Sequence, residues 1–120
     1  VQDSYGGSLH ERSHGESFLA LLHHRLNGKG LYIFDEPESA LSIISQLNML
    51  TRIRQLVEKS SQFIIATHSP ILMAYPDADI YQVSAEGINL VAYEDTEQYR
   101  LTKYFMNNRT KMLSELGIDL

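Results

Sequence analysis

The sequence contains no cysteine and no tryptophan, and only three of its 120 residues are proline. The absence of cysteine excludes disulfide bonds and thiolate zinc sites, and it is typical of a reducing compartment. No apolar run approaches the roughly 20 residues that a membrane-spanning helix needs, and the polar start of the chain does not resemble a signal peptide. We therefore expect a cytoplasmic protein.

Basic residues are also scarce, since 10 Lys and Arg stand against 15 Asp and Glu, which gives a formal net charge of −5. This balance argues against a broad basic surface for nucleic acid, although it leaves room for a local patch. The content of 43% hydrophobic and 21% charged residues is that of an ordinary folded domain rather than a disordered chain. A chain of this length is expected to form one domain.

Alternating helical and strand-like patterns of apolar residues predict an α/β fold. Two short apolar runs, 31–34 and 63–66, are predicted to be strands buried on both faces. The segment between them, from about Ser45 to Lys59, has helical spacing. It is expected to be the crossover that makes the two strands parallel neighbours. Its predicted core stripe consists of Leu47, Leu50, Ile53 and Val57.

Further elements are predicted on either side of this unit. A helix is expected from Glu16 to Asn27, and a short helix is expected to start at Pro70. Two strands around a turn are expected at 80–83 and 88–93. The final helix is expected to begin after a cap at Asp95 or Thr96 and to carry Leu101, Tyr104 and Phe105.

Polar residues follow both of the predicted buried strands. Asp35 and Glu36 come directly after the first, and Thr67 and His68 come after the second. Because ligands gather at the carboxyl ends of parallel strands, we expect these side chains to meet at one edge of the sheet. One acid is suited to hold a hydrated Mg2+ ion, the other to polarise a water, and the imidazole to donate to a phosphate oxygen. The alternatives are a solvated acidic turn and a structural or exposed histidine.

A third group, Ser13-His14-Gly15-Glu16-Ser17, opens the first predicted helix. A small residue, a glycine and free backbone N–H groups at a helix start form a potential anion site. An ordinary helix cap is the alternative interpretation of the same residues.

In this order and spacing, the three groups resemble the C-terminal half of an ABC-type ATPase domain. Ser13–Glu16 is similar to the core of the signature motif, and Leu31–Asp35 is similar to the Walker B strand. Glu36 stands at the position of the catalytic glutamate, and His68 stands at that of the switch histidine. The D-loop position is occupied by Ser39, Ala40, Leu41 and Ser42.

Segments 62–76 and 93–102 further resemble small stand-alone ATPases, which are described as AAA or ABC-type ATP-binding proteins. The resemblance implies a P-loop NTPase-like three-layer α/β sandwich with a mainly parallel sheet, a C-terminal β-hairpin and a C-terminal helix. Residues 1–120 would be the C-terminal portion of one such domain.

The resemblance also implies a head-to-tail homodimer with ATP held between the protomers. Asp35 would hold Mg2+ through water, Glu36 would activate the attacking water, and His68 would contact the γ-phosphate. Across the dimer, the nucleotide would be bound by Ser13, Gly15 and Glu16.

The sequence also departs from the pattern of this family. No Gly-x-x-x-x-Gly-Lys-Ser/Thr motif occurs, so the phosphate cradle and its lysine are absent, and the Q-loop is absent too. His14 replaces a signature glycine, Glu16 replaces a glutamine, and Ser42 replaces the usual D-loop aspartate. We therefore expect a fragment that binds ATP poorly by itself and associates through an open sheet edge.

Two alternatives to a soluble ATPase stay open, namely the nucleotide-binding subunit of a membrane transporter and a non-catalytic interaction module. A Q-loop would favour the transporter subunit, because the membrane subunit docks there. Binding of ATP would distinguish an ATPase from the interaction module.

Overall fold

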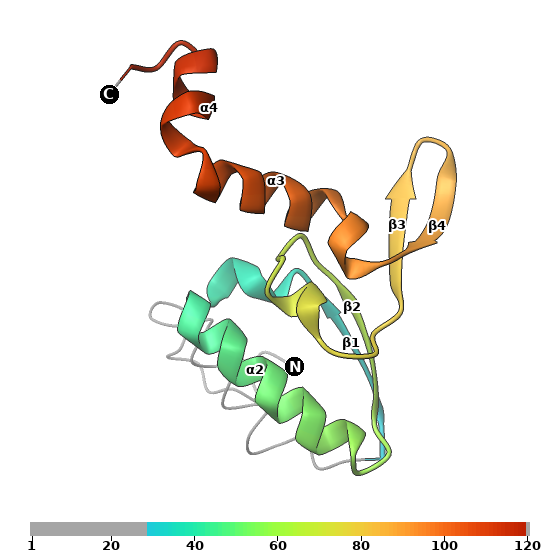
Figure 1. Ribbon diagram of the computed structural model, residues 1–120. Coiled ribbons are helices and arrows are strands. Elements are labelled where there is room, and N and C mark those ends of the chain that lie inside the picture. Colours follow the sequence, from blue (N-terminus) through green and yellow to red (C-terminus); the bar gives the residue numbers. More distant parts are fainter. Residues whose placement is uncertain (1–28, 120) are drawn as a thin grey trace. The chain divides into compact units, whose positions relative to one another are not determined.

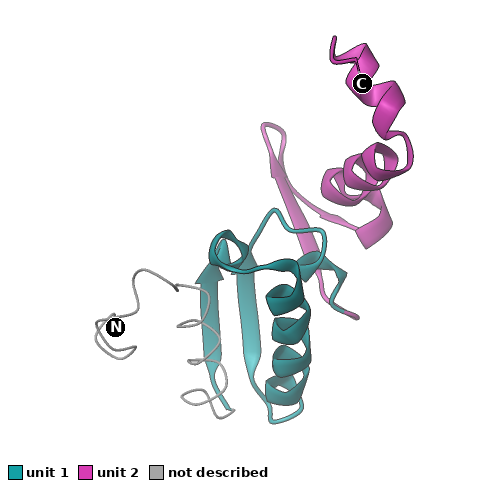
Figure 2. Cartoon of the chain, turned by 90° about the vertical axis from the view of Figure 1, so that its left-hand side faces the viewer, with its two compact units in different colours: residues 1–75 teal, residues 76–120 magenta. Residues whose placement is uncertain are grey.

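The computed structural model describes residues 29–119 of the chain (Figure 1). The chain divides into two compact units, residues 1–75 and residues 76–120 (Figure 2). The helix predicted from Glu16 to Asn27, and the nucleotide-binding positions Ser13, Gly15 and Glu16 with it, lie outside the described residues. The described elements are β1 (Leu31–Asp35), η3 (Pro37–Ala40), α2 (Ile43–Val57), β2 (Gln62–Ala66), η4 (Leu72–Ala74), β3 (Ile80–Ser84), β4 (Gly87–Val91), η5 (Tyr93–Asp95), α3 (Glu97–Asn107) and α4 (Arg109–Glu115).

The first unit is built around two parallel strands joined by a helix. Strand β1 pairs with β2 from Leu31 opposite Gln62 to Asp35 opposite Ala66, so the two strands end at the same level. Helix α2 connects them and is capped by Ser42, whose hydroxyl accepts a hydrogen bond from the backbone N–H of Ser45 at 3.1 Å. The predicted parallel pairing is therefore confirmed.

The core of this unit lies between α2 and one face of the sheet. The side chain of Met49 is fully buried, and Ile53 is 4% exposed. Leu41 and Leu72 complete the buried cluster, and η4 supplies the latter in place of the short helix expected from Pro70. The strand side chains that pack against this cluster are Phe34, Phe63 and Ile65.

The predicted core stripe of α2 is wrong at both ends. Leu47 and Val57 are 46% and 37% exposed, whereas the residues one position earlier, Gln46 and Leu56, are buried. The reason is that α2 is apolar over a wide arc that also includes Ile43 and Ile44, which are exposed. A pattern this wide is compatible with more than one buried stripe, and the sheet selects the stripe that contains Met49.

The prediction that both strands are buried on two faces is also wrong for the part of the chain that the structure describes. Phe34 and Phe63 are half-buried on the face that packs against the core. On the alternate positions, Leu31, Ile33 and Ile64 are 56%, 69% and 52% exposed. Within residues 29–119, α2 covers one face of this sheet, so the side chains alternate between core and solvent.

The second unit begins with the predicted hairpin. Strands β3 and β4 pair antiparallel from Ile80 opposite Val91 to Ser84 opposite Gly87. Gly87 has φ = 119°, which a side chain at this position would oppose. The second strand ends earlier than predicted because residues 93–95 form η5. Helix α3 begins directly after the predicted cap Thr96, whose hydroxyl accepts from the backbone N–H of Tyr99 at 3.2 Å.

The described strands form two separate two-stranded sheets, one parallel and one an antiparallel hairpin. This arrangement is a mixed α/β structure, as predicted. Among the described residues, no helix has both the length and the apolar character that crossing a bilayer requires.

The buried face of α2, which contains Met49 rather than Leu47, generates a prediction about stability. Met49→Ala should lower the free energy of unfolding by about 2–5 kcal/mol, because a buried side chain is lost and a cavity remains. Leu47→Ala, in which the side chain removed is 46% exposed, should cost less than about 1 kcal/mol. Urea denaturation of the purified variants measures both values. Equal losses in the two variants would contradict the observed orientation of the helix.

Candidate functional site

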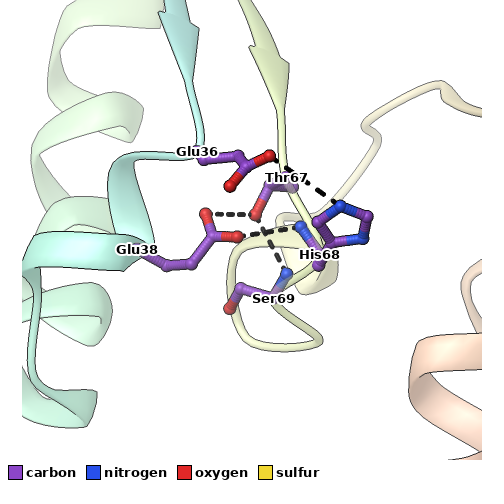
Figure 3. Close-up of polar contacts among 5 residues, drawn as sticks. All are labelled: Glu36, Glu38, Thr67, His68 and Ser69. Carbon is purple, nitrogen blue, oxygen red and sulfur yellow. Dashed lines mark hydrogen bonds and ion pairs between the residues drawn. The ribbon is translucent and has the colours of Figure 1, made fainter.

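The two strand ends predicted to carry the chemistry lie together. Asp35 is opposite Ala66 at the end of the paired segment, and the backbone N–H of the next residue, Glu36, donates to the carbonyl oxygen of Ala66 at 2.7 Å. The hydrogen bonding between β1 and β2 thus extends one residue past the end of β1. Thr67 and His68 follow Ala66 directly, so all four predicted polar residues leave the sheet at one edge. Figure 3 shows three of them, Glu36, Thr67 and His68.

Glu36 has an unusual backbone conformation. Its φ and ψ angles are 50° and 54°, in the left-handed region, which costs a residue with a side chain about 1–2 kcal/mol. The next residue, Pro37, disfavours the right-handed helical region at Glu36. The turn is closed by the carbonyl oxygen of Glu36, which accepts from the backbone N–H of Ser39 at 3.1 Å. Strain at an exposed carboxylate is typical of functional positions.

The Glu36 carboxylate faces the His68 imidazole. Oε2 of Glu36 lies 3.9 Å from Nε2 of His68, and the two side chains are 55% and 75% exposed. A contact this long between exposed groups contributes little to stability. Both groups are therefore accessible to a ligand at the sheet edge.

Glu38 is a site residue that the sequence analysis did not single out. Its Oε1 accepts from the Thr67 hydroxyl at 2.6 Å, and its Oε2 accepts from the backbone N–H of His68 at 2.9 Å (Figure 3). The carboxylate thereby joins η3 to the loop after β2. The pattern that could have identified it is an acid shortly after one strand of a parallel pair, with a threonine directly after the other strand.

The environment of Glu38 shifts its pKa. Partial burial raises the pKa, but the hydrogen bonds from the Thr67 hydroxyl and the His68 N–H favour the charged form and outweigh it. The pKa of Glu38 is therefore lowered from its ordinary value of 4.5. A lowered pKa in the folded state means that the ionised carboxylate stabilises the fold above the unfolded-state pKa, and that this stabilisation is lost as the pH falls through the folded-state pKa.

We call the two hydrogen bonds that the Glu38 carboxylate accepts from Thr67 and His68 the Glu38 bridge. Further hydrogen bonds inside the protein support this bridge. The Thr67 hydroxyl also accepts from the backbone N–H of Ser69 at 3.0 Å. The buried Ser69 hydroxyl donates to Oε1 of Gln46 on α2 at 2.5 Å, and Nε2 of Gln46 donates to the carbonyl oxygen of Leu41 at 3.4 Å. This chain of hydrogen bonds holds the loop after β2 against the start of α2.

The residues predicted as a D-loop have mixed surroundings. Ser39 is exposed and Ala40 is half-buried. The side chain of Leu41 belongs to the core, with 8% exposure, and Ser42 caps α2. In this segment, Ser39 is therefore the position whose side chain is accessible without loss of a packing or capping contact.

The residues at the edge fit Mg2+ in a limited sense. Within residues 29–119, no group of three or more His, Asp or Glu residues is placed to enclose a metal ion. Mg2+ does not need such a group, because it retains several waters and is usually bound by one or two carboxylates together with substrate phosphates. Asp35, exposed at the end of β1, supplies a donor of the required kind.

The pKa shift of Glu38 generates a prediction about pH. At pH 7, Glu38→Gln should be less stable than the parent by about 1–3 kcal/mol. The glutamine amide has one acceptor oxygen instead of two, and it lacks the negative charge that strengthens both hydrogen bonds. Since the parent loses its advantage as Glu38 becomes protonated, the difference should shrink as the pH falls below about 4.5. Chemical denaturation at several pH values measures the difference, and a gap independent of pH would contradict the assignment.

The left-handed conformation of Glu36 generates a second prediction. Glu36→Gly and Glu36→Gln both remove the charge, but only glycine relieves a backbone cost of about 1–2 kcal/mol. Glycine in turn destabilises the fold by about 0.5–1 kcal/mol, because it raises the conformational entropy of the unfolded chain. The glycine variant should therefore equal or exceed the glutamine variant in stability, by about 0–1.5 kcal/mol in urea denaturation. A markedly less stable glycine variant would argue against strain at this position.

Two comparisons with known proteins concern the family resemblance of this chain. Residues 17–74 match a family model described as "AAA domain, putative AbiEii toxin, Type IV TA system", and the match includes Asp35, Glu36 and His68. An uncharacterized ABC transporter ATP-binding protein of Haemophilus influenzae is 36% identical over 67 residues, which are 55% of this chain and 26% of that protein. The chain thus spans about a quarter of the length of the curated relative it matches. These findings confirm the resemblance to part of an ATPase domain of the ABC/AAA type.

Proposed function

We propose that this chain supplies the part of an ATP-binding ATPase at which ATP is hydrolysed, at the carboxyl ends of β1 and β2. One observation carries the proposal: the in-register parallel pairing of β1 with β2 brings Glu36 and His68 to within 3.9 Å of each other at the carboxyl edge of the sheet. Phosphoryl transfer needs mostly positioned charges and a positioned water, and this edge offers an acid pair and an imidazole. The family match over residues 17–74 supports the same class of reaction.

The two adjacent acids have different roles in this proposal. Asp35 ends β1 and binds Mg2+ through water, and the ion when bound neutralises charge on the phosphates. Glu36 begins the turn, and its exposed carboxylate lies 3.9 Å from the His68 imidazole, where it accepts hydrogen bonds from the attacking water and orients it. Adjacent side chains at the end of a strand point to opposite sides, so that one acid acts on the metal and the other on the water.

His68 acts on the phosphate side of the proposed reaction. Its imidazole is exposed at the edge, where it donates a hydrogen bond to an oxygen of the γ-phosphate. On a second protomer, Ser13, Gly15 and Glu16 bind the same nucleotide, as the resemblance to the signature motif implies. The proposed assembly is a homodimer in which ATP lies between the protomers.

The chain does not contain every part that this activity requires. The sequence has no Gly-x-x-x-x-Gly-Lys-Ser/Thr motif, so the backbone cradle and the lysine for the β- and γ-phosphates come from outside these 120 residues. The isolated 120-residue chain is accordingly proposed to bind ATP weakly.

A transporter subunit is the second candidate function, and one observation favours it. The relative from Haemophilus influenzae is described as an ABC transporter ATP-binding protein. In that case the protein binds a membrane-embedded partner as well as ATP. Co-purification with a membrane protein from detergent extracts would favour this candidate over a stand-alone ATPase.

The role of Glu36 is tested by substitution. In the full-length protein, Glu36→Gln should lower ATP turnover by a factor on the order of 10²–10⁴, because the amide cannot polarise the water, while ATP binding is retained. Steady-state phosphate release measures turnover, and equilibrium dialysis with labelled ATP measures binding.

Glu58→Gln is a matched control, since Glu58 is an exposed glutamate at the C-cap of α2. It should leave both quantities unchanged. Turnover of Glu36→Gln within a few-fold of the parent would remove Glu36 from the catalytic role.

A further inference from the structure

We propose that Glu38 is a positioning residue that places His68 against the turn at Glu36, so that the two catalytic side chains act together. This inference rests on the proposed ATPase function. Each oxygen of the Glu38 carboxylate accepts one hydrogen bond from the loop after β2, from the Thr67 hydroxyl at 2.6 Å and from the His68 N–H at 2.9 Å. Figure 3 shows the carboxylate between the two loops, with both bonds directed toward the second loop.

The bridge acts on the backbone of His68 rather than on its ring. The imidazole is 75% exposed, and its contact with Glu36 at 3.9 Å is too long and too solvated to hold it in place. The hydrogen bond to the His68 N–H instead fixes the point from which the side chain extends. Because the bond is made to an ionised acceptor, it is stronger than one between neutral groups.

Glu38 is suited to this task because the same element carries the other catalytic group. Glu36 is the N-cap of η3, and Glu38 lies within its first turn. A displacement of η3 therefore moves the Glu36 carboxylate and the anchor of His68 in the same direction. The bridge makes the distance between the two catalytic side chains less sensitive to motion of either loop.

In the loop after β2, the Glu38 bridge is held by the hydroxyls of Thr67 and Ser69, each of which has one defined direction of donation. The single proton of the Thr67 hydroxyl is donated to Glu38, which leaves a lone pair of the same oxygen to accept from the Ser69 N–H at 3.0 Å. The buried Ser69 hydroxyl then donates to Gln46 on α2. The anchor of His68 is thereby connected to the helix that forms the core.

The proposal predicts a split between turnover and binding in the full-length protein. Glu38→Ala and Thr67→Val should each lower kcat by roughly 10–100-fold, because a small misplacement of a catalytic group has effects of this size. The affinity for ATP should change by less than about threefold, since neither residue contacts the nucleotide in the proposed site. Thr67→Ser, which retains the hydroxyl, should restore kcat to within a few-fold of the parent.

A double variant tests whether the two residues act as one unit. Adding Thr67→Val to Glu38→Ala should lower kcat little beyond the single change, because the first substitution already breaks the shared bond. Independent, multiplicative losses would overturn the bridge, and so would a Thr67→Ser variant as slow as Thr67→Val. Glu58→Ala, at the exposed C-cap of α2, serves as the control and should leave kcat unchanged.

A readout that does not depend on hydrolysis separates this proposal from the proposed function. In Glu38→Ala, amide exchange at His68 followed by NMR should accelerate at least about tenfold, because the N–H loses its acceptor. Faster exchange and lower kcat support the proposal. Unchanged exchange, or unchanged kcat in a protein that Glu36→Gln inactivates, overturns the positioning role alone. Full turnover in Glu36→Gln overturns the proposed function and this inference with it.

Discussion

The pairing of β1 with β2 from Leu31–Gln62 to Asp35–Ala66 determines where two distant segments of the chain end. Parallel strands in register place their carboxyl ends at one level, and the polar residues that follow are therefore adjacent. A shift of one residue would exchange the two faces of a strand and would move Asp35 relative to His68. The register is held by Phe34 and Phe63, which pack on the same cluster beneath α2.

Polar contacts between the loops that follow β1 and β2 add to the arrangement that the strand pairing establishes. The sheet brings the loops near each other, but the Glu38 carboxylate and the buried Ser69–Gln46 pair determine how they meet. These groups use their donors and acceptors almost completely, since the Ser69 hydroxyl donates once and also accepts from the N–H groups of Ile71 and Leu72 at 3.1 Å. Partially buried polar groups arranged in this way favour one loop conformation over others, because any alternative leaves a donor or an acceptor without a partner.

The parts that could be predicted from the sequence are those that depend on local patterns. Short apolar runs bounded by polar residues predicted both strands, and from them the meeting of Glu36 and His68 at one edge. The buried stripe of α2 could not be predicted, because apolar residues surround too much of the helix and only the sheet selects Met49 over Leu47. Glu38 was missed for a similar reason: its role depends on Thr67, which lies 29 residues away. The roles of Ser13, Gly15 and Glu16 stay predictions.

The proposed catalytic edge is assembled from a single strand–helix–strand crossover, since only 30 residues separate Glu38 from the His68 N–H that it binds. Closing a loop of this size carries a modest entropic cost, and each doubling of its length would add only about 0.6 kcal/mol. The two loops of this edge are therefore brought together within one continuous stretch of chain at a modest entropic cost.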